Sequence, residues 1–383
     1  MSQRRLRPVS DVVVNAGHML LWEVDIQHME MRTLSSRRPQ LPWSGHKPPS
    51  ATMLDWLRLI RASGLATIAS NCAAMVLFAF YTGEGLDPKW LGRLLLADPA
   101  RVAWLLLAST LLYAAGMAWN DLADVERDKL IHPKRPLPSG RLHLPTAMVA
   151  SALMGIGAIV AALMAEGPTG ALAALTVLVL ALLYDFEAKH IPWLGSLVMR
   201  LTRAAHACFA LLLIGQDALR SALVGDVPTG ARCVLMYPLI LLLYTWGLCA
   251  ISELEHRPGR RWELLVGGGL MAIAVSMALA QFIGAPWQRA WFLAGGPWQL
   301  ALVAGVVLGA GAAALLLWHV GKPLIAAVTG ASRAQVGRTL VAGLGGLILL
   351  DAVVASAAHP VGALAILALW PLFRMVSVAI RMD

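Results

Sequence analysis

The sequence predicts an all-α protein, a polytopic bundle of transmembrane helices with nine or ten spans. Three observations support this fold class. The 383 residues are 58% hydrophobic and only 14% charged, which is too little charge to cover a soluble protein of this length. Apolar runs recur along the chain, each near the roughly 20 residues that a helix needs to cross the hydrocarbon core. Many runs are rich in Ala and Gly, such as GAIVAALMA and LGAGAAALLLW, and small residues let helices pack closely in lipid.

Ten apolar segments are candidate spans, and each is expected to form one helix. They are residues 64–81, 101–119, 146–165, 169–184, 194–214, 232–251, 264–283, 298–319, 338–358 and 361–380. Only His359-Pro360 separates the last two, so nine spans is the alternative. The sequence has no CxxC, HxxxH or HExxH pattern and therefore indicates neither a zinc site nor a disulfide framework.

Residues 1–52 differ in kind from the membrane domain predicted for residues 53–383. They hold the basic segments RRLR and SRRPQLP and no apolar run of signal-peptide length, which predicts a basic, disordered tail. The alternative is that translation begins at Met53, where an amphipathic segment suited to the membrane interface starts.

The distribution of basic residues predicts the orientation in the membrane. With the N-terminus inside, the inner connections carry twelve Lys and Arg and the outer connections six, before the basic tail is counted. We therefore expect an integral protein of a bacterial-type inner membrane with a cytoplasmic N-terminus. The net charge of +9 fits this topology and contact with anionic lipid, and it does not require nucleic acid as a partner.

The end of the span at 101–119 carries the strongest chemical signal. In WNDLADVERD, Asp121, Asp124 and Asp128 stand at i, i+3 and i+7, so they share one face if the helix continues. Asn120 adds an amide oxygen beside them. Three carboxylates on one face repel each other, so we expect a cation among them, and hard oxygen ligands suit Mg²⁺.

A basic loop follows this acidic segment directly. The residues KLIHPKRPLPSGRLHLP include Arg135 and Arg141 among turn-forming residues. Carboxylates that hold Mg²⁺ next to Lys and Arg predict a diphosphate site, and inside a membrane bundle the natural diphosphate carries a hydrocarbon tail. The alternative is an ordinary positive-inside loop with incidental acids.

These motifs resemble those of the UbiA superfamily of intramembrane prenyltransferases. NDxxDxxxD followed by RPLPSGR is similar to that family's first signature, and LYDFEAKHIPWLGSLVMRLTRAAH, with Tyr184 and Lys189, is similar to its next cytoplasmic loop. LRLIRASGLATIASN, with Arg58, Arg61 and Asn71, is similar to its N-terminal region. The finer patterns LYDxxAKHxPxLG and AISxLE resemble the EboC-like subgroup.

The resemblance implies a UbiA-like bundle in which Mg²⁺, held by two acidic motifs, binds a polyprenyl diphosphate. The prenyl group would then be transferred to an aromatic or other lipophilic acceptor, which the sequence does not identify. By this resemblance the metal ligands are Asn120, Asp121, Asp124 and Asp128. The catalytic residues are Asp121, Asp124, Asp128 and Lys189, and the substrate-binding residues are Asn71, Asn120, Arg135, Arg141 and Tyr184.

Arg203 and Asp185 are two further charged residues near this region. Arg203 sits inside the span at 194–214, where a buried arginine is costly, so we expect it to line the phosphate end of the chamber; the alternative is snorkelling to the interface. Asp185 and Glu187 lie in the loop with Lys189 and could assist the metal, orient the acceptor or simply pair with neighbouring bases. Asp351, in LILLDAVVAS, would be part of a proton or ion path or an acid misplaced by an error in helix register.

The second acidic motif departs from the family pattern. The corresponding stretch, YTWGLCAISELEHRPGRR, has no aspartate, and Glu253 and Glu255 are two residues apart, which points them to opposite sides of a helix. Three interpretations stay open. A second ion is held by Glu253 or Glu255, or cationic residues replace that ion. In the third, the protein binds a prenyl diphosphate without turning it over and acts as a lipid carrier or pathway scaffold.

Overall fold

The computed structural model describes residues 51–83, 98–214, 228–254, 261–284, 297–330, 332–358 and 360–380. These ranges contain helices and connections but no strand, which confirms the all-α class. In chain order the elements are α2 (Met53–Leu59), η1 (Ala62–Gly64), α3 (Leu65–Gly83), α5 (Pro99–Ala123), α6 (Val125–Ile131), α7 (Leu144–Phe186), η2 (Ala188–His190), α8 (Pro192–Phe209), η3 (Ala210–Ile214), α10 (Pro228–Glu253), α11 (Arg261–Gly284), α13 (Pro297–Gly330), α14 (Arg333–Ala358) and α15 (Pro360–Ala379). The predicted basic tail lies almost wholly outside the described residues.

Seven of the described helices are long and apolar enough to cross a membrane, or eight if α2 and the helical segment after it form one span bent by 60°. The expected nine or ten spans are therefore not confirmed. Two features explain the lower number. The expected spans 146–165 and 169–184 fall in a single helical range, α7. The expected span at 194–214 corresponds to α8 with η3. α8 contains two arginines and a histidine, and it is not among the seven helices that are long and apolar enough to cross a membrane.

A sharp break divides α7 into two halves. Glu166 and Gly167 leave the helical conformation, Gly167 with φ of 62° and ψ of −151°, and Pro168 follows. A side chain added at Gly155 would lie 3.2 Å from a methyl of Leu178, although a continuous helix would separate these residues by about 34 Å. The two halves therefore fold back against each other, as expected for the two separate spans predicted at 146–165 and 169–184.

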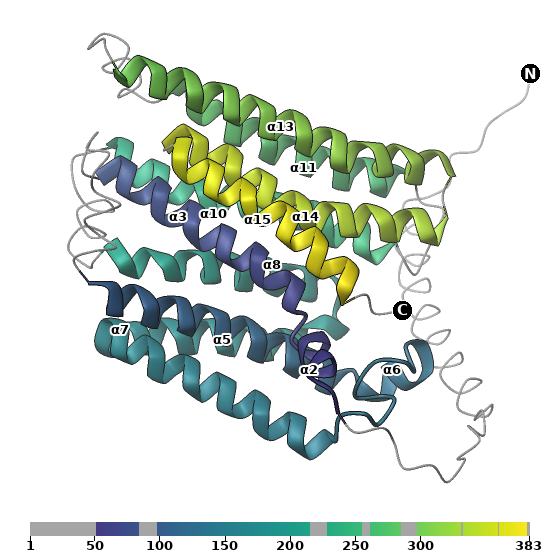
Figure 1. The fold of residues 1–383 in the computed structure, drawn as a ribbon. Helices are drawn as coiled ribbons and strands as arrows, with labels where there is room; N and C mark the ends of the chain where they lie inside the picture. The colour runs from purple at the N-terminus through teal and green to yellow at the C-terminus, as the bar shows by residue number, and fades with distance from the viewer. Residues whose placement is uncertain are drawn as a thin grey trace, which may run out of the picture. The chain divides into compact units, whose positions relative to one another are not determined.

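The helices pack in neighbouring pairs, with α14 at the centre of the contacts. The most extensive pairings are α5 with α7, α13 with α14 and α10 with α11 (Figure 1). α14 also packs against α3, α10, α11 and α15, and 83% of its apolar stretch is buried inside the bundle. This arrangement leaves the ends of α5 and α7 together, which brings their polar terminal residues into one place.

Candidate active site

The acidic segment at the end of α5 is interrupted by one turn. α5 ends at Ala123, and α6 begins at Val125, with Asp124 between them at φ −94° and ψ 4°. The backbone bonds from Asp124 to Asn120 (3.0 Å) and from Asp128 to Asp124 (2.8 Å) are kept across this turn. The expected continuous helix is thus broken at its middle aspartate, although the three acids still lie near one another along the chain.

Each of the three aspartates has its own basic partner. Arg61 donates to Asp121 at 3.0 Å, Lys189 to Asp124 at 2.8 Å and Arg135 to Asp128 at 2.5 Å. These partners come from the connection before η1, from η2 and from the loop after α6. Asp121 and Asp128 are 3% and 4% exposed, so charge-assisted bonds of this kind are needed to keep ionised carboxylates there.

A cavity of about 310 Å³ opens among these ion pairs. Its charged lining comes from the ends of α5, α6, α7 and α14 and from the segments beside them, and consists of Arg61, Asp124, Arg127, Asp128, Arg135, Asp185 and Arg333. Four arginines and three aspartates thus surround one space, with Met117, Ala181 and Met199 among the apolar residues on the helical side. Such a lining suits a phosphate group attached to an apolar chain.

The chemistry of the donor groups fits a magnesium ion. Carboxylate and amide oxygens line the cavity, and the buried Oδ2 atom of Asp185 has no hydrogen-bond partner. Among the described residues, however, no three His, Cys, Asp or Glu side chains are arranged to hold a metal ion. An ion here would have to compete with the basic partners of the aspartates. Asp124, Asp128 and Asp185 are the carboxylates of the cavity lining that could hold it together with diphosphate oxygens.

Asn120, an expected metal ligand, lines the cavity and contacts two charged side chains. In the amide orientation that satisfies both of its polar atoms, it donates to Asp185 at 3.1 Å and accepts from Arg61 at 3.1 Å. Asn120 therefore joins the end of α5 to the end of α7. Tyr184, next to Asp185, lines the cavity, and its part in substrate binding stays a prediction.

Several other predicted site residues lie away from the cavity lining. Asn71 is buried in the bundle and donates to Asp351 at 2.7 Å, and Arg203 donates to Thr67 at 2.9 Å. Glu253 is exposed at the end of α10 and does not line the cavity. Glu255 lies outside the described residues.

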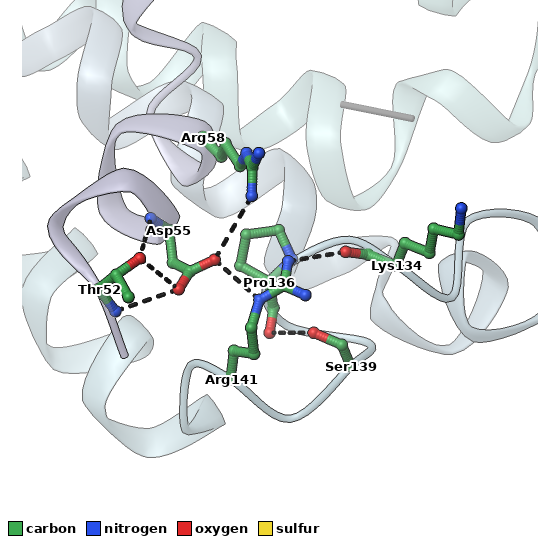
Figure 2. A network of polar contacts seen from close by, with 7 residues as sticks. All are labelled: Thr52, Asp55, Arg58, Lys134, Pro136, Ser139 and Arg141. Carbon is green, nitrogen blue, oxygen red and sulfur yellow. Dashed lines mark hydrogen bonds and ion pairs between the residues drawn. The ribbon is translucent and has the colours of Figure 1, made fainter. Parts of the chain in front are cut away.

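Arg141 holds the loop after α6 against α2. Its guanidinium donates to Asp55 at 2.8 Å and to the carbonyl of Lys134 at 2.8 Å (Figure 2). Asp55 also accepts from Thr52, which caps α2 in a capping box. Burial opposes the ionised form of Asp55, but the bonds from Thr52 and Arg141 outweigh it, so the pKa of Asp55 lies below its ordinary value. Within RPLPSGR, Arg135 thus reaches the cavity and Arg141 fixes the loop.

Three arginines of the cavity lining, Arg61, Arg127 and Arg333, are not among the site residues expected from the sequence, and Asp185 is expected there only as one of three alternatives. Arg61 has a left-handed backbone with φ of 47°, which is uncommon for a residue with a side chain and is kept here by its bonds to α5. The sequence signal for Arg61 was its place in LRLIRASG. Arg333 begins α14, more than 140 residues after Asp185 along the chain, and no local sequence pattern marks it as a site residue.

A bundle of apolar helices that ends at an arginine-rich and aspartate-rich cavity indicates an integral membrane protein with a charged cavity. The sequence model of the UbiA prenyltransferase family matches residues 73–320, more than half of the chain. The chain therefore belongs to the UbiA prenyltransferase family. The EboC-like subgroup stays a prediction.

The chain is also similar to archaeal proteins named digeranylgeranylglyceryl phosphate synthase. It is 39% identical over 103 residues to the one from Metallosphaera sedula, a match that covers 27% of this chain and 36% of that protein. With the one from Methanococcus aeolicus it shares 26% over 211 residues, covering 53% and 70% of the two chains. With the one from Ignicoccus hospitalis it shares 32% over 166 residues, covering 42% and 49%.

Two solved structures are similar as well. One concerns digeranylgeranylglyceryl phosphate synthase, with 19% identity, a TM-score of 0.43 and coverage of 76% of this chain and 97% of that one. The other is a UbiA homologue from Aeropyrum pernix, with 20% identity, a TM-score of 0.47 and coverage of 74% and 97%.

Proposed function

We propose that the protein is a membrane prenyltransferase that binds a polyprenyl diphosphate with Mg²⁺ in this cavity and transfers the prenyl group to a lipophilic acceptor. The observation that carries the proposal is the cavity itself, where four arginines and three aspartates meet at the end of an apolar bundle. Membership of the UbiA prenyltransferase family supports the same reaction class. The relatives' names make geranylgeranyl diphosphate the first donor to test.

The reaction that we propose is an alkylation. The allylic carbon–oxygen bond of the diphosphate breaks and pyrophosphate leaves with the electron pair. The allylic carbon then bonds to a nucleophilic atom of the acceptor, which loses a proton. Arg135 and Arg333 line the cavity and would neutralise the growing charge of the leaving group. When bound, Mg²⁺ would supply further positive charge to stabilise the pyrophosphate leaving group.

Two further parts of the proposal concern where the protein works. We propose that it resides in a bacterial-type inner membrane, with the N-terminus and the cavity on the cytoplasmic side. The excess of Lys and Arg in the predicted inner connections supports this orientation. Arg127, Arg135, Lys189 and Arg333, which belong to those connections, all lie in or beside the cavity region.

The second candidate function is a carrier or scaffold that binds the diphosphate without turnover. Two observations favour it. The sequence at the end of α10 has no aspartate where the second acidic motif is expected. Glu253, at that end, is exposed and does not line the cavity.

The test is Mg²⁺-dependent binding and turnover of geranylgeranyl diphosphate by the detergent-purified full chain. We expect binding to require Mg²⁺ and to weaken at least about tenfold in Asp124→Asn. Glu126→Gln is the matched control, because Glu126 is an exposed acid of α6 that pairs with Lys129. Release of pyrophosphate in the presence of membrane lipid extract would support the transferase. Binding without release would favour the carrier, and no binding would contradict both.

A further inference from the structure

We propose that Asp185, at the end of α7, is a ligand of the divalent cation that accompanies the diphosphate, in place of acids from the end of α10. This inference rests on the proposed function. It assigns a role to a residue outside the NDxxDxxxD segment. It also identifies α7 as the helix that supplies the carboxylate expected from the second acidic motif.

One of the two carboxylate oxygens of Asp185 lacks a hydrogen-bond partner. Its side chain is 3% exposed, and the residue lines the cavity. Oδ1 accepts the hydrogen bond from Asn120 at 3.1 Å, whereas Oδ2 has none. A buried carboxylate oxygen without a donor or cation is rare, because removing it from water is costly unless something replaces the lost contacts.

The neighbouring basic side chains do not donate a hydrogen bond to the Oδ2 atom of Asp185. Lys189 and Arg61 are the positive charges that act on Asp185, but Lys189 donates to Asp124 and Arg61 to Asp121. Asp124 and Asp121 also act on Asp185, and their charge repels it. A cation placed between Asp185 and Asp124 would satisfy the open oxygen and relieve this repulsion.

The number and kind of ligands available beside Asp185 match those that usually coordinate Mg²⁺ in proteins. This ion is usually held by one or two carboxylates, with phosphate oxygens and water as its other ligands. Asp185 and Asp124 supply two carboxylates, and the arginines of the cavity remain available for the other phosphate oxygens.

Two nearby acids do not share these properties. Glu187, two residues after Asp185, is exposed and does not line the cavity. Glu253 is exposed at the end of α10. Of these three acids, only Asp185 is both buried and part of the cavity wall, so α7 is the element that supplies the carboxylate.

The experiment uses Mn²⁺ as a spectroscopic probe for the site. Free Mn²⁺ is measured by electron paramagnetic resonance during titration of the detergent-purified full chain with geranylgeranyl diphosphate present. The variants are Asp185→Asn, Glu187→Gln as the matched control and Asp124→Asn. We expect the Kd for Mn²⁺ to rise at least about tenfold in Asp185→Asn and to change less than about twofold in Glu187→Gln.

Melting provides a readout that does not depend on turnover. Mn²⁺ with geranylgeranyl diphosphate should raise the melting temperature of the wild type, because it binds only the folded state, and should raise that of Asp185→Asn much less. Without metal, Asp185→Asn should melt no lower than the wild type, because it removes a buried carboxylate whose Oδ2 atom has no hydrogen-bond partner. Asp185→Ser serves in its place if Asp185→Asn does not fold.

The outcomes separate this inference from the proposed function. If Asp185→Asn binds Mn²⁺ as the wild type does while Asp124→Asn loses it, Asp185 is not a ligand and the proposed function stands. If the wild type binds no Mn²⁺ with the diphosphate present, the proposed function fails and this inference fails with it.

Discussion

At the scale of single residues, Arg135 and Arg141 belong to one short motif but contact different parts of the protein. Arg135 donates to the buried Asp128 and lines the cavity. Arg141 donates to the buried Asp55 and joins the loop to α2 (Figure 2). From the sequence both are expected to hold phosphate, so the contacts in the structure give a way to separate their roles.

We predict that Arg135→Ala mainly weakens ligand binding and that Arg141→Ala mainly lowers stability. Arg135→Ala should weaken geranylgeranyl diphosphate binding by about tenfold or more, because it removes a charge-assisted bond of about 1.5–3 kcal/mol. Arg141→Ala should lower the free energy of unfolding by about 1–3 kcal/mol, because it leaves Asp55 buried without its charged donor, and should leave binding nearly unchanged. Diphosphate titration and thermal melting measure the two effects. Loss of binding in Arg141→Ala with unchanged melting would show that Arg141 holds phosphate, as the sequence predicts.

The residues that could be predicted are those whose chemistry is local in the sequence. Asn120, Asp124, Asp128 and Arg135 lie within 16 consecutive residues, and all of them reach the cavity. Arg333 comes from the start of α14, far along the chain, and only the packing of the helices brings it there. The same packing decides that Asn71 and Arg203 lie elsewhere, which no spacing rule expresses.

At the scale of elements, the break in α7 fixes how the site is assembled. The second half of α7 runs back along the first half and ends at Tyr184 and Asp185, beside the end of α5. The sequence predicts this break, because one apolar run of about span length ends at residue 165 and the next begins at residue 169. It does not predict the turn at Asp124, where no Gly or Pro is present and the helix is interrupted by one residue.

We predict that Gly167→Ala destabilises the fold. The backbone of Gly167, with φ of 62° and ψ of −151°, lies in a region that is almost restricted to glycine, so a side chain there should cost about 1–3 kcal/mol. Gly311→Ala in α13 is the control, since nothing lies within 4 Å of an added Cβ and alanine favours helix. Thermal melting in detergent should fall for Gly167→Ala and stay equal or rise for Gly311→Ala. Equal melting of both variants would mean that the break does not depend on glycine.

At the scale of the whole molecule, Asp351 connects three helices inside the bundle. It lies on α14, is fully buried and accepts from Ser70 at 2.5 Å, Asn71 at 2.7 Å and Tyr237 at 2.6 Å. Ser70 and Asn71 belong to α3 and Tyr237 to α10. The sequence shows an acid inside a span, but its partners are 114 to 281 residues away along the chain. From the sequence alone, a proton or ion path and an error in helix register are therefore the alternatives. The three bonds identify a structural role for the carboxyl group.

We predict that Asp351→Ala lowers the free energy of unfolding by at least about 2 kcal/mol, because Ser70, Asn71 and Tyr237 each lose the acceptor of a short buried hydrogen bond and keep only a longer one. Ser356→Ala is the control on the same helix. Its hydroxyl is also buried but bonds only to the carbonyl of Val353 one turn earlier, so its removal should cost about 1 kcal/mol or less. Thermal melting in detergent measures both variants.

A double variant tests whether the contact itself is responsible. Tyr237→Phe removes one of the three donors, so its cost should largely disappear when Asp351 is already alanine. Additive costs would show that Tyr237 and Asp351 stabilise the bundle independently. If Asp351→Ala melts like the wild type but loses turnover of geranylgeranyl diphosphate, the carboxyl group acts in the reaction, and the network of α3, α10 and α14 would not be what holds the bundle together.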